Sequence, residues 1–224
     1  MAIDRFYSKK NTGYFSHARL DILDLLPAGG FRTVVDVGGS SGATLSAIKA
    51  RWPNVRTICI DIHEESVRTA RERGHEAFIC DIERSTPDVF GTCDLALFLD
   101  ILEHLVDPWR RLTEIVNQLP PGARVIASLP NVRFWEASCR LFFLADWRLR
   151  DAGVMDRTHL RFFTRRTGAE MLRAANLHIY KIRAGFPGAR RYPIINLLSA
   201  GLIRDFLSAQ YVYAAEKAQN PESS

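Results

Sequence analysis

The sequence predicts a doubly wound α/β fold, in which helices cover both faces of a mostly parallel β-sheet. Short β-branched or apolar runs alternate with runs that carry apolar residues at helical spacing, and this alternation is typical of βαβ units. The 224 residues are 47% hydrophobic, which is enough to bury one sizeable core. We therefore predict that residues 1–224 form a single domain.

The expected elements follow from these runs and from the prolines and glycines that end them. Each expected strand is a short apolar or β-branched run: 33–37, 55–61, 75–81, 93–100, 123–130, 177–185 and 209–217. Each expected helix shows helical spacing: 14–26, 41–52, 64–74, 107–119 and 165–176. Two insertions interrupt the alternation, 131–166 and 186–208, and the second contains an expected helix over 190–207.

The composition excludes several classes of protein. The four cysteines lie far apart and form no Cys-x-x-Cys, which argues against a disulfide scaffold or thiolate metal site and favours a reducing, cytoplasmic setting. We expect no signal peptide. We also expect no transmembrane segment, because the longest uncharged apolar stretch, Tyr192–Ile203, is shorter than the roughly 20 residues that span a membrane. The net charge of +5 hints at an acidic partner, although an arginine-rich genome would also explain 25 arginines among 30 basic residues.

A glycine-rich segment, VVDVGGSSG over Val34–Gly42, connects the first expected strand to a helix. Glycine allows a ligand to approach the backbone closely, and a helix N-terminus offers N–H groups to an anion. The segment lacks the G-x-G-x-x-G pattern of nicotinamide dinucleotide sites, because Ser40 or Ser41 stands at the second required glycine. It resembles instead the (V/L)-(L/V)-D-(V/I)-G-x-G-x-G segment of class I S-adenosylmethionine (SAM) methyltransferases, with Ser40 in place of the middle glycine.

Further matches to this family follow in the expected order. Asp61 ends the second expected strand, where the family's acid binds the ribose hydroxyls, and Asp81 ends the third, where the family's aspartate receives the adenine amino group. The resemblance implies SAM as cofactor and a Rossmann-like, seven-stranded sheet whose last strand is antiparallel. The residues that it implies for cofactor binding are Tyr14, Arg19, Asp36, Gly38, Gly39, Gly42, Asp61, Ile62, Asp81, Ile82 and Leu99. It also implies a lid helix within 1–30, a SAM-binding core over 31–130, and insertions at 131–166 and 186–208 on the substrate side.

An acid-x-x-Glu-His pattern follows the fourth expected strand. Asp100, Glu103 and His104 would share one face of a helical turn, since they are spaced i, i+3 and i+4. The pattern is similar to the divalent-metal sites of small-RNA 2′-O-methyltransferases and to an acid-x-x-Glu-His of ubiquinone-pathway O-methyltransferases, with His159 as the fourth ligand. Three interpretations stay open: a site for Mg²⁺, Mn²⁺ or Zn²⁺, a metal-free site with His104 or His159 as general base, and a structural role.

The insertion over 131–166 interleaves eight arginines with aromatic residues. Such a surface suits a flat or acyl group beside an anion, as in a nucleotide-sugar, a lipid-linked pyrophosphate or RNA. The alternative is a small helical cap that packs its apolar residues inward. Residues 128–131 and 156–164 resemble a bacterial subgroup of the family that acts in polysaccharide, antibiotic and other small-molecule pathways.

These observations predict O-methylation of a small-molecule, sugar or glycolipid hydroxyl by a monomer or homodimer. A sugar hydroxyl needs a base, and a histidine with a pKa near 6.5 suits that role, so we expect His159 first and His104 second, beside Glu103. The alternatives are an RNA 2′-O- or N-methyltransferase with a divalent metal, an amine N-methyltransferase, and a non-catalytic protein that binds SAM or a partner. We expect a small-molecule acceptor, which an anionic group would fit, in preference to a nucleic acid.

Overall fold

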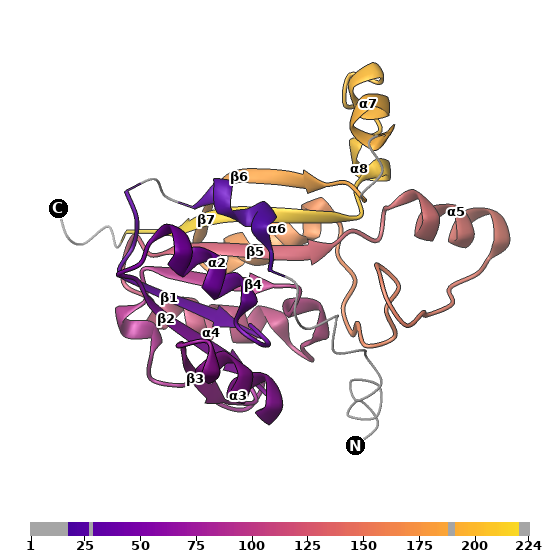
Figure 1. The fold of residues 1–224 in the computed structure, drawn as a ribbon. Coiled ribbons are helices and arrows are strands. Elements are labelled where there is room, and N and C mark those ends of the chain that lie inside the picture. Colours follow the sequence, from indigo (N-terminus) through magenta and orange to yellow (C-terminus); the bar gives the residue numbers. More distant parts are fainter. Residues whose placement is uncertain (1–17, 27–28, 188–190, 220–224) are drawn as a thin grey trace.

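A computed structural model describes residues 18–26, 29–187 and 191–219 (Figure 1). The strands form one seven-stranded sheet in the order β3-β2-β1-β4-β5-β7-β6. The strands are β1 (Thr33–Val37), β2 (Arg56–Asp61), β3 (Glu76–Ile79), β4 (Leu95–Leu99), β5 (Arg124–Pro130), β6 (Leu177–Gly185) and β7 (Gln210–Lys217). The α-helices are α2 (Ala43–Arg51), α3 (Glu64–Glu72), α4 (Pro108–Gln118), α5 (Trp135–Leu144), α6 (Arg165–Ala174), α7 (Arg191–Leu198) and α8 (Arg204–Leu207). Three short 3₁₀ helices are η2 (Leu20–Leu25), η3 (Phe90–Thr92) and η4 (Leu102–His104).

The strand directions confirm the predicted fold. β1 pairs in parallel with β2 and β4, β2 pairs in parallel with β3, and β4 pairs in parallel with β5. Of the strands described, β7 alone runs against its neighbours, β5 and β6. This reversal places the first residue of β7, Gln210, opposite the last residue of β5, Pro130. Gln210 therefore lies at the carboxyl edge of the parallel strands, where open α/β sheets bind ligands.

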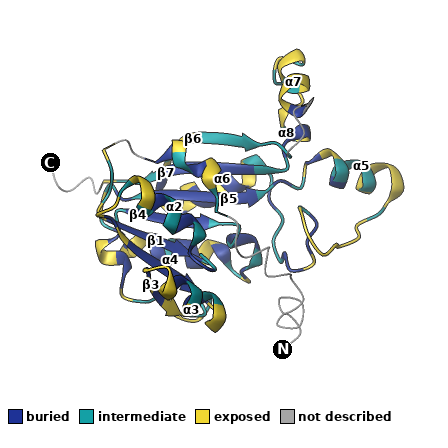
Figure 2. Ribbon diagram, viewed as in Figure 1, coloured by how far each residue is buried: buried dark blue, intermediate teal, exposed yellow. Residues whose placement is uncertain are grey.

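Both faces of the sheet bury apolar side chains, which explains why the central strands are continuous apolar runs in the sequence. In β1, Val35 and Val37 join the core that α4 and α6 cover. Val34 points the other way, into the core that η2, α2 and α3 cover. Figure 2 shows the central strands buried between these two helical layers.

Two expected helices differ from the structure. In the described part of the lead-in segment, the helix is the 3₁₀ helix η2, and Tyr14 lies outside the described residues. The single helix expected over 190–207 is two helices, α7 and α8. Ala200 and Gly201 both take left-handed backbone conformations, with φ of 49° and 78°, and the Gly201 N–H donates to Asn196 O (2.9 Å), which ends α7.

The two insertions stand beyond the carboxyl edge of the sheet. α5 follows β5, whereas α7 and α8 lie between β6 and β7, and Figure 1 shows both groups projecting from the body of the sheet. The buried Asn131 joins their bases, because its Nδ2 donates to the carbonyl oxygens of Asp205 (2.6 Å) and Ser208 (2.8 Å). None of the helices in the described ranges is long and apolar enough to cross a membrane.

Candidate functional site

Glycines shape the loop between β1 and α2 at the carboxyl edge. Gly38 and Gly42 both have φ of 71°, in the left-handed region that favours glycine. A Cβ on Gly38 would lie 2.8 Å from Ile101 Cδ1, and a Cβ on Gly42 would lie 2.6 Å from His75 Cδ2. Neither position therefore has room for a side chain, and the loop carries the backbone close to the N-terminus of α2, whose first N–H groups lack intrahelical acceptors.

Ser40 keeps the shape of this loop although it replaces the family's middle glycine. Its φ of 49° is left-handed, a conformation that serine adopts at an energetic cost. The Ser40 N–H donates to Asp61 Oδ2 (2.9 Å), which ties the loop to the end of β2. The departure from the family pattern thus leaves the turn in place.

Two buried carboxylates, Asp36 and Asp61, lie at the carboxyl edge, on β1 and β2. A Cβ on Gly39 would lie 2.9 Å from the Asp36 carboxyl, so Asp36 packs directly under the loop. Burial, followed by the negative charge of Asp61, raises the pKa of Asp36 to about 7. Asp61 accepts hydrogen bonds from the Ser40 and His63 N–H groups (both 2.9 Å), which orient its two oxygens. Both carboxylates are therefore held rigidly beside the loop.

The other residues expected to bind the cofactor lie at the same edge. Asp81 follows β3, and its carboxylate accepts from the Glu83 N–H (3.0 Å). Ile82 is buried, Leu99 is half-buried at the end of β4, and Ile62 exposes 54% of its surface after β2. Asp61 and Asp81 thus follow adjacent strands, with apolar side chains between and beside them.

Arg19 reaches this edge from the lead-in segment and enters a polar network. Its guanidinium pairs with the Asp100 carboxylate and donates to Ser128 Oγ (3.2 Å) and Gln210 Oε1 (2.8 Å). Its backbone N–H donates to Thr44 Oγ1 on α2 (3.2 Å). The network joins β4, β5, β7 and the first turn of α2, so Arg19 lies where the cofactor is expected and is engaged by protein side chains.

Asp100 lies apart from the metal-ligand set in which the sequence placed it. Its φ of 55° is left-handed, and the helical turn begins two residues later, as the 3₁₀ helix η4. The expected shared face of Asp100, Glu103 and His104 is therefore wrong. The Asp100 carboxylate instead accepts a hydrogen bond from Ser128 Oγ (2.8 Å) and pairs with Arg19.

Glu103, His104 and His159 do come together, with a ligand atom from each within 4.8 Å of the others. His104 Nδ1 lies 3.0 Å from Thr158 O, and His159 Nδ1 lies 3.1 Å from Val154 O. A carbonyl oxygen cannot donate, so Nδ1 carries the proton in each ring and the lone pair of a neutral imidazole is on Nε2. The two rings meet edge to face, with centroids 4.8 Å apart. Both Nε2 atoms are thus prepared to accept a proton or to bind a metal.

The Glu103 carboxylate is the unusual group in this cluster. The residue is 1% exposed, and within the described ranges neither of its carboxylate oxygens has a hydrogen-bond partner. His159 Nε2 lies 4.0 Å from Glu103 Oε1. Burial, followed by the charge of Asp100, raises the pKa of Glu103 well above its usual range. A buried carboxyl with unmet hydrogen-bonding capacity is energetically costly, which sets Glu103 apart from the other buried side chains of the cluster.

The insertion over 131–166 packs only part of its apolar surface inward. Phe134 and Phe163 are buried, whereas Phe142 and Phe143 on α5 are among the most exposed aromatic side chains described. A cavity of about 230 Å³ lies between α5 and the loop that precedes His159. Its lining includes Glu136, Arg140, Asp146, Arg148, Arg150 and Val154. The cavity thus combines three arginines with the residue whose carbonyl holds the His159 ring.

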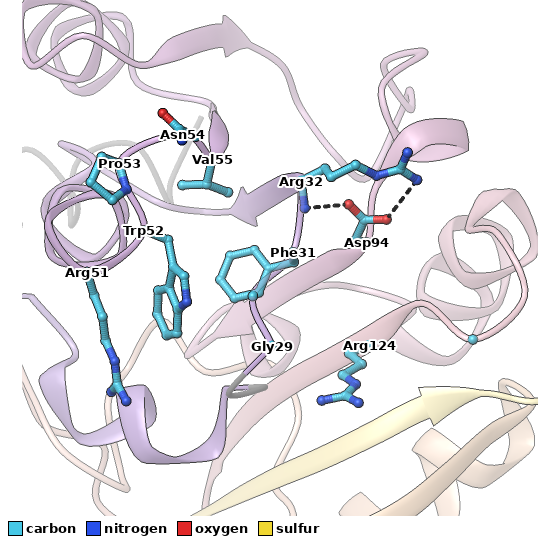
Figure 3. Close-up of a pocket in the computed structure, with 12 residues that line it drawn as sticks. Gly29, Phe31, Arg32, Arg51, Trp52, Pro53, Asn54, Val55, Asp94 and Arg124 are labelled. Atoms are coloured by element: carbon cyan, nitrogen blue, oxygen red, sulfur yellow. Dashed lines mark hydrogen bonds and ion pairs between the residues drawn. The ribbon is translucent and has the colours of Figure 1, made fainter.

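A second, more open cavity of about 800 Å³ lies at the opposite edge of the sheet (Figure 3). Phe31 and Trp52 pack together there with ring centroids 5.1 Å apart, beside Arg32, Asp94 and Arg124. These residues precede the strands or follow α2, so they lie at the amino edge. The cavity is separate from every residue that the sequence assigned to catalysis or cofactor binding.

Gln210 and Ser128 are the site residues that sequence reasoning missed or left without a role. Ser128 lies in the 128–131 segment that resembles a bacterial subgroup of the family, but the resemblance gives it no role. Nothing in the local sequence around Gln210 singles that residue out. Gln210 reaches Asp100 because β7 is antiparallel, with Gln210 Nε2 donating to Asp100. The signal that could have found it is topological: the first residue of an antiparallel last strand lies at the carboxyl edge.

Comparisons with known proteins agree with this geometry. A model of the methyltransferase domain matches residues 7–182. The chain is 28% identical over 143 residues to a trans-aconitate 2-methyltransferase of Azoarcus sp. (strain BH72), which covers 62% of this chain and 55% of that protein. It is 30% identical over 152 residues to a desmethyl-yatein O-methyltransferase of Sinopodophyllum hexandrum, which covers 63% of this chain and 42% of that protein.

A solved structure shares the fold at low sequence identity. It contains the Haloferax volcanii Trm112 methyltransferase activator and its candidate methyltransferase, and the match has a TM-score of 0.65, 19% identity and coverage of 97% and 96% of the two chains. The matches to the first curated relatives span 34% to 55% of the length of those proteins. Because the domain model matches well over half of the chain, the protein belongs to the class I SAM-dependent methyltransferases, a family whose cofactor is SAM.

Proposed function

We propose that this chain transfers the methyl group of SAM to a hydroxyl of a small, anionic acceptor. The observation that carries the proposal is the pair of histidines, His104 and His159, whose Nδ1 atoms are held by carbonyl oxygens beside the carboxyl edge. Bound SAM would supply an electrophilic methyl group on a sulfonium sulfur: the acceptor oxygen forms a bond to the methyl carbon as the carbon–sulfur bond breaks in line, and S-adenosylhomocysteine is the leaving group. The remaining requirements are alignment of the acceptor and removal of its proton.

In this proposal the residues at the carboxyl edge have distinct roles. Asp61 binds the ribose hydroxyls, Asp81 binds the adenine amino group, and Asp36 lies beneath the glycine loop opposite the cofactor's ammonium group. His159 Nε2 takes the hydroxyl proton, with His104 as the second candidate. Arg19 and Asp100 position the lead-in segment over the cofactor.

The same cluster also fits a divalent cation. Glu103 offers a buried carboxylate without a hydrogen-bond partner among the described residues, and the two imidazoles offer Nε2 lone pairs. Two histidines and one carboxylate form a donor set that transition metals accept, and the carbonyl contacts of Nδ1 are those that orient ligating histidines. A bound cation would supply acidification of the acceptor hydroxyl, and Glu103 would then be ionised.

The acceptor class is inferred from the cavity beside α5. Its three arginines, Arg140, Arg148 and Arg150, suit a phosphate or carboxylate, although nearby acids pair with each of them. The names of two relatives include a small molecule, trans-aconitate, and an O-methyl transfer, which supports a small-molecule acceptor over RNA. The free thiols of all four cysteines support a cytoplasmic location. The single domain over 1–224 and the state of monomer or homodimer stay predictions.

The test is a calorimetric titration of the purified chain with S-adenosylhomocysteine, with metal analysis of the same sample. We expect micromolar binding, followed by methyl transfer from labelled SAM to a hydroxyl acceptor in a screen of sugar nucleotides and small organic acids. Stoichiometric metal would favour the metal-assisted alternative, and methyl transfer to nitrogen would contradict the choice of a hydroxyl. A folded sample that does not bind S-adenosylhomocysteine would contradict the proposed function altogether.

The affinity for S-adenosylhomocysteine is expected to rise with pH around neutrality. The pKa of Asp36 is raised to about 7, so the carboxyl is mostly protonated below that value, and the ammonium group of the bound ligand would favour its ionised form. Binding would then release a proton, and the Kd at about pH 6 should be roughly tenfold weaker than at about pH 8. Calorimetry at both pH values measures this ratio. An Asp36→Asn variant should bind more weakly with a flat pH profile, and equal affinities of the wild type at both pH values would refute the assignment.

A further inference from the structure

The insertions expose two groups of apolar side chains that the proposed chemistry does not use. Six side chains form these groups, each between 67% and 89% exposed: Phe142, Phe143 and Leu144 on α5, and Leu197, Leu198 and Leu202 on and after α7. We refer to these six residues as the apolar cap. Figure 2 shows that the helices carrying them are exposed along much of their length. Exposed apolar surface of this extent marks an interaction site.

The two parts of the apolar cap belong to one structural unit. α5 packs against α8, and Arg133 of the first insertion pairs with Asp205 of the second (3.3 Å). Asn131 joins the same segments through the carbonyl oxygens of Asp205 and Ser208. Both helices project from the end of the sheet where β5 and β6 terminate, which is the edge that carries the candidate site (Figure 1). A partner that covers the apolar cap would therefore lie beside the candidate site.

The net charge of the two insertions indicates the chemistry of the partner that would cover the apolar cap. Residues 131–166 and 186–208 together carry eleven arginines and five acidic residues, a net charge of +6, whereas the whole chain carries +5. The remainder of the chain is thus slightly acidic, so the net positive charge of the sequence falls within these two segments. Part of it lies in the body of the fold, since Arg165 and Arg166 begin α6. Segments that are cationic and also expose apolar side chains are characteristic of peripheral attachment to anionic membranes.

We propose that the apolar cap docks onto the surface of an anionic lipid bilayer. The apolar side chains would enter the boundary between head groups and acyl chains, and arginines of the same insertions would contact lipid phosphates. The uncharged run over Tyr192–Ile203 spans at most about 18 Å as a helix, which is well short of the roughly 30 Å of a hydrocarbon core, so this segment lies in the interface.

Other occupants fit less well. A symmetric contact between two copies would bring together two pairs of insertions, each pair with a net sequence charge of +6, and like charges repel each other. RNA would satisfy the arginines, but Leu144, Leu197 and Leu198 have no planar face on which bases stack. Acyl chains accept aliphatic and aromatic side chains alike, and anionic head groups satisfy the arginines. If the proposed methyl transfer holds, this docking would present a lipid-carried acceptor to the site.

The test is co-sedimentation of the full chain with vesicles of phosphatidylcholine alone or with about 30% phosphatidylglycerol. We expect binding to the anionic vesicles that weakens with salt and is much lower on phosphatidylcholine. The double variants Leu197→Asp/Leu198→Asp and Phe142→Asp/Phe143→Asp should each reduce partitioning at least about tenfold. These side chains are exposed, so the variants should fold normally, which circular dichroism verifies.

The matched control is Asn117→Asp/Gln118→Asp, which adds the same charge to exposed positions at the far end of α4. It should partition like the wild type. The proposal is overturned if the wild type ignores anionic vesicles, if the apolar-cap variants partition unchanged, or if those variants instead dissociate a dimer or release RNA. S-adenosylhomocysteine binding, measured separately on each variant, should stay unchanged, which separates failure of the docking from failure of the proposed function.

Discussion

Replacement of Asp61 by alanine is expected to weaken S-adenosylhomocysteine binding by at least about 100-fold. A carboxylate that accepts two ribose hydroxyls makes two charge-assisted hydrogen bonds, each contributing about 1.5–3 kcal/mol, and a loss of about 3 kcal/mol corresponds to more than 100-fold in Kd. The variant also leaves the Ser40 and His63 N–H groups without the acceptor that they share, so the loop loses its tie to β2. Calorimetric titration of the variant measures the effect directly.

The control for this prediction separates binding from folding. Glu72→Ala removes an exposed acid from the end of α3, in the layer next to β2, and should bind S-adenosylhomocysteine like the wild type. The thermal midpoint of Asp61→Ala should fall by a few degrees, because the loss of the two backbone hydrogen bonds outweighs the relief of burying the carboxylate, so affinity is compared below the midpoint, where both proteins are folded. An Asp61→Ala variant that keeps wild-type affinity would move the ribose site away from the end of β2.

The glycine loop at the carboxyl edge could be predicted from the sequence because its determinants are local. A strand that ends in Asp36, followed within six residues by Gly38, Gly39 and Gly42, specifies a strand, a left-handed turn and a helix without reference to distant segments. Asp61 and Asp81 end strands that pair in parallel, so their meeting follows from the topology.

The polar network around Asp100 could not be predicted because its members are distant in sequence. Arg19 and Gln210 are 191 residues apart and meet only because the lead-in segment crosses the edge where β7 begins. The helical spacing of Asp100 was misleading, since its left-handed backbone places it before the helical turn that carries Glu103. No periodicity in the sequence reports a single residue with positive φ.

The exposure of the apolar side chains in the insertions could not be predicted from the sequence either. The sequence of an apolar run such as 141–144 does not indicate whether its side chains are buried or exposed, because burial depends on which other segments cover the run. The structure places nothing described over Phe142 and Phe143, so the inward-packing alternative fails for these two residues. Phe134 and Phe163, in the same insertion, are buried, as the inward-packing alternative predicts.

Replacement of His159 by alanine is expected to lower kcat by about 10²–10⁴-fold while leaving the Kd for S-adenosylhomocysteine within about twofold. The loss of a general base affects only the step in which the acceptor oxygen loses its proton, and His159 Nδ1 contacts the insertion at Val154 rather than the cofactor loop. Single-turnover methyl transfer to the acceptor found in the screen measures the rate, and calorimetry measures the affinity. His178→Ala, an exposed histidine on β6, serves as the matched control and should behave like the wild type.

Glu103→Gln decides between the two chemical roles of this cluster. Burial raises the pKa of Glu103 and so favours its neutral carboxyl in the metal-free protein, and the isosteric amide should preserve most of the activity if His159 acts as a base. If the cluster binds a cation, Glu103 must be ionised, and the amide variant should lose both the metal and the activity. Treatment of the wild type with EDTA should have the same effect. Full activity in His159→Ala, with or without metal, would remove His159 from the mechanism and leave His104 as the remaining candidate base, since its Nδ1 is held in the same way by Thr158 O.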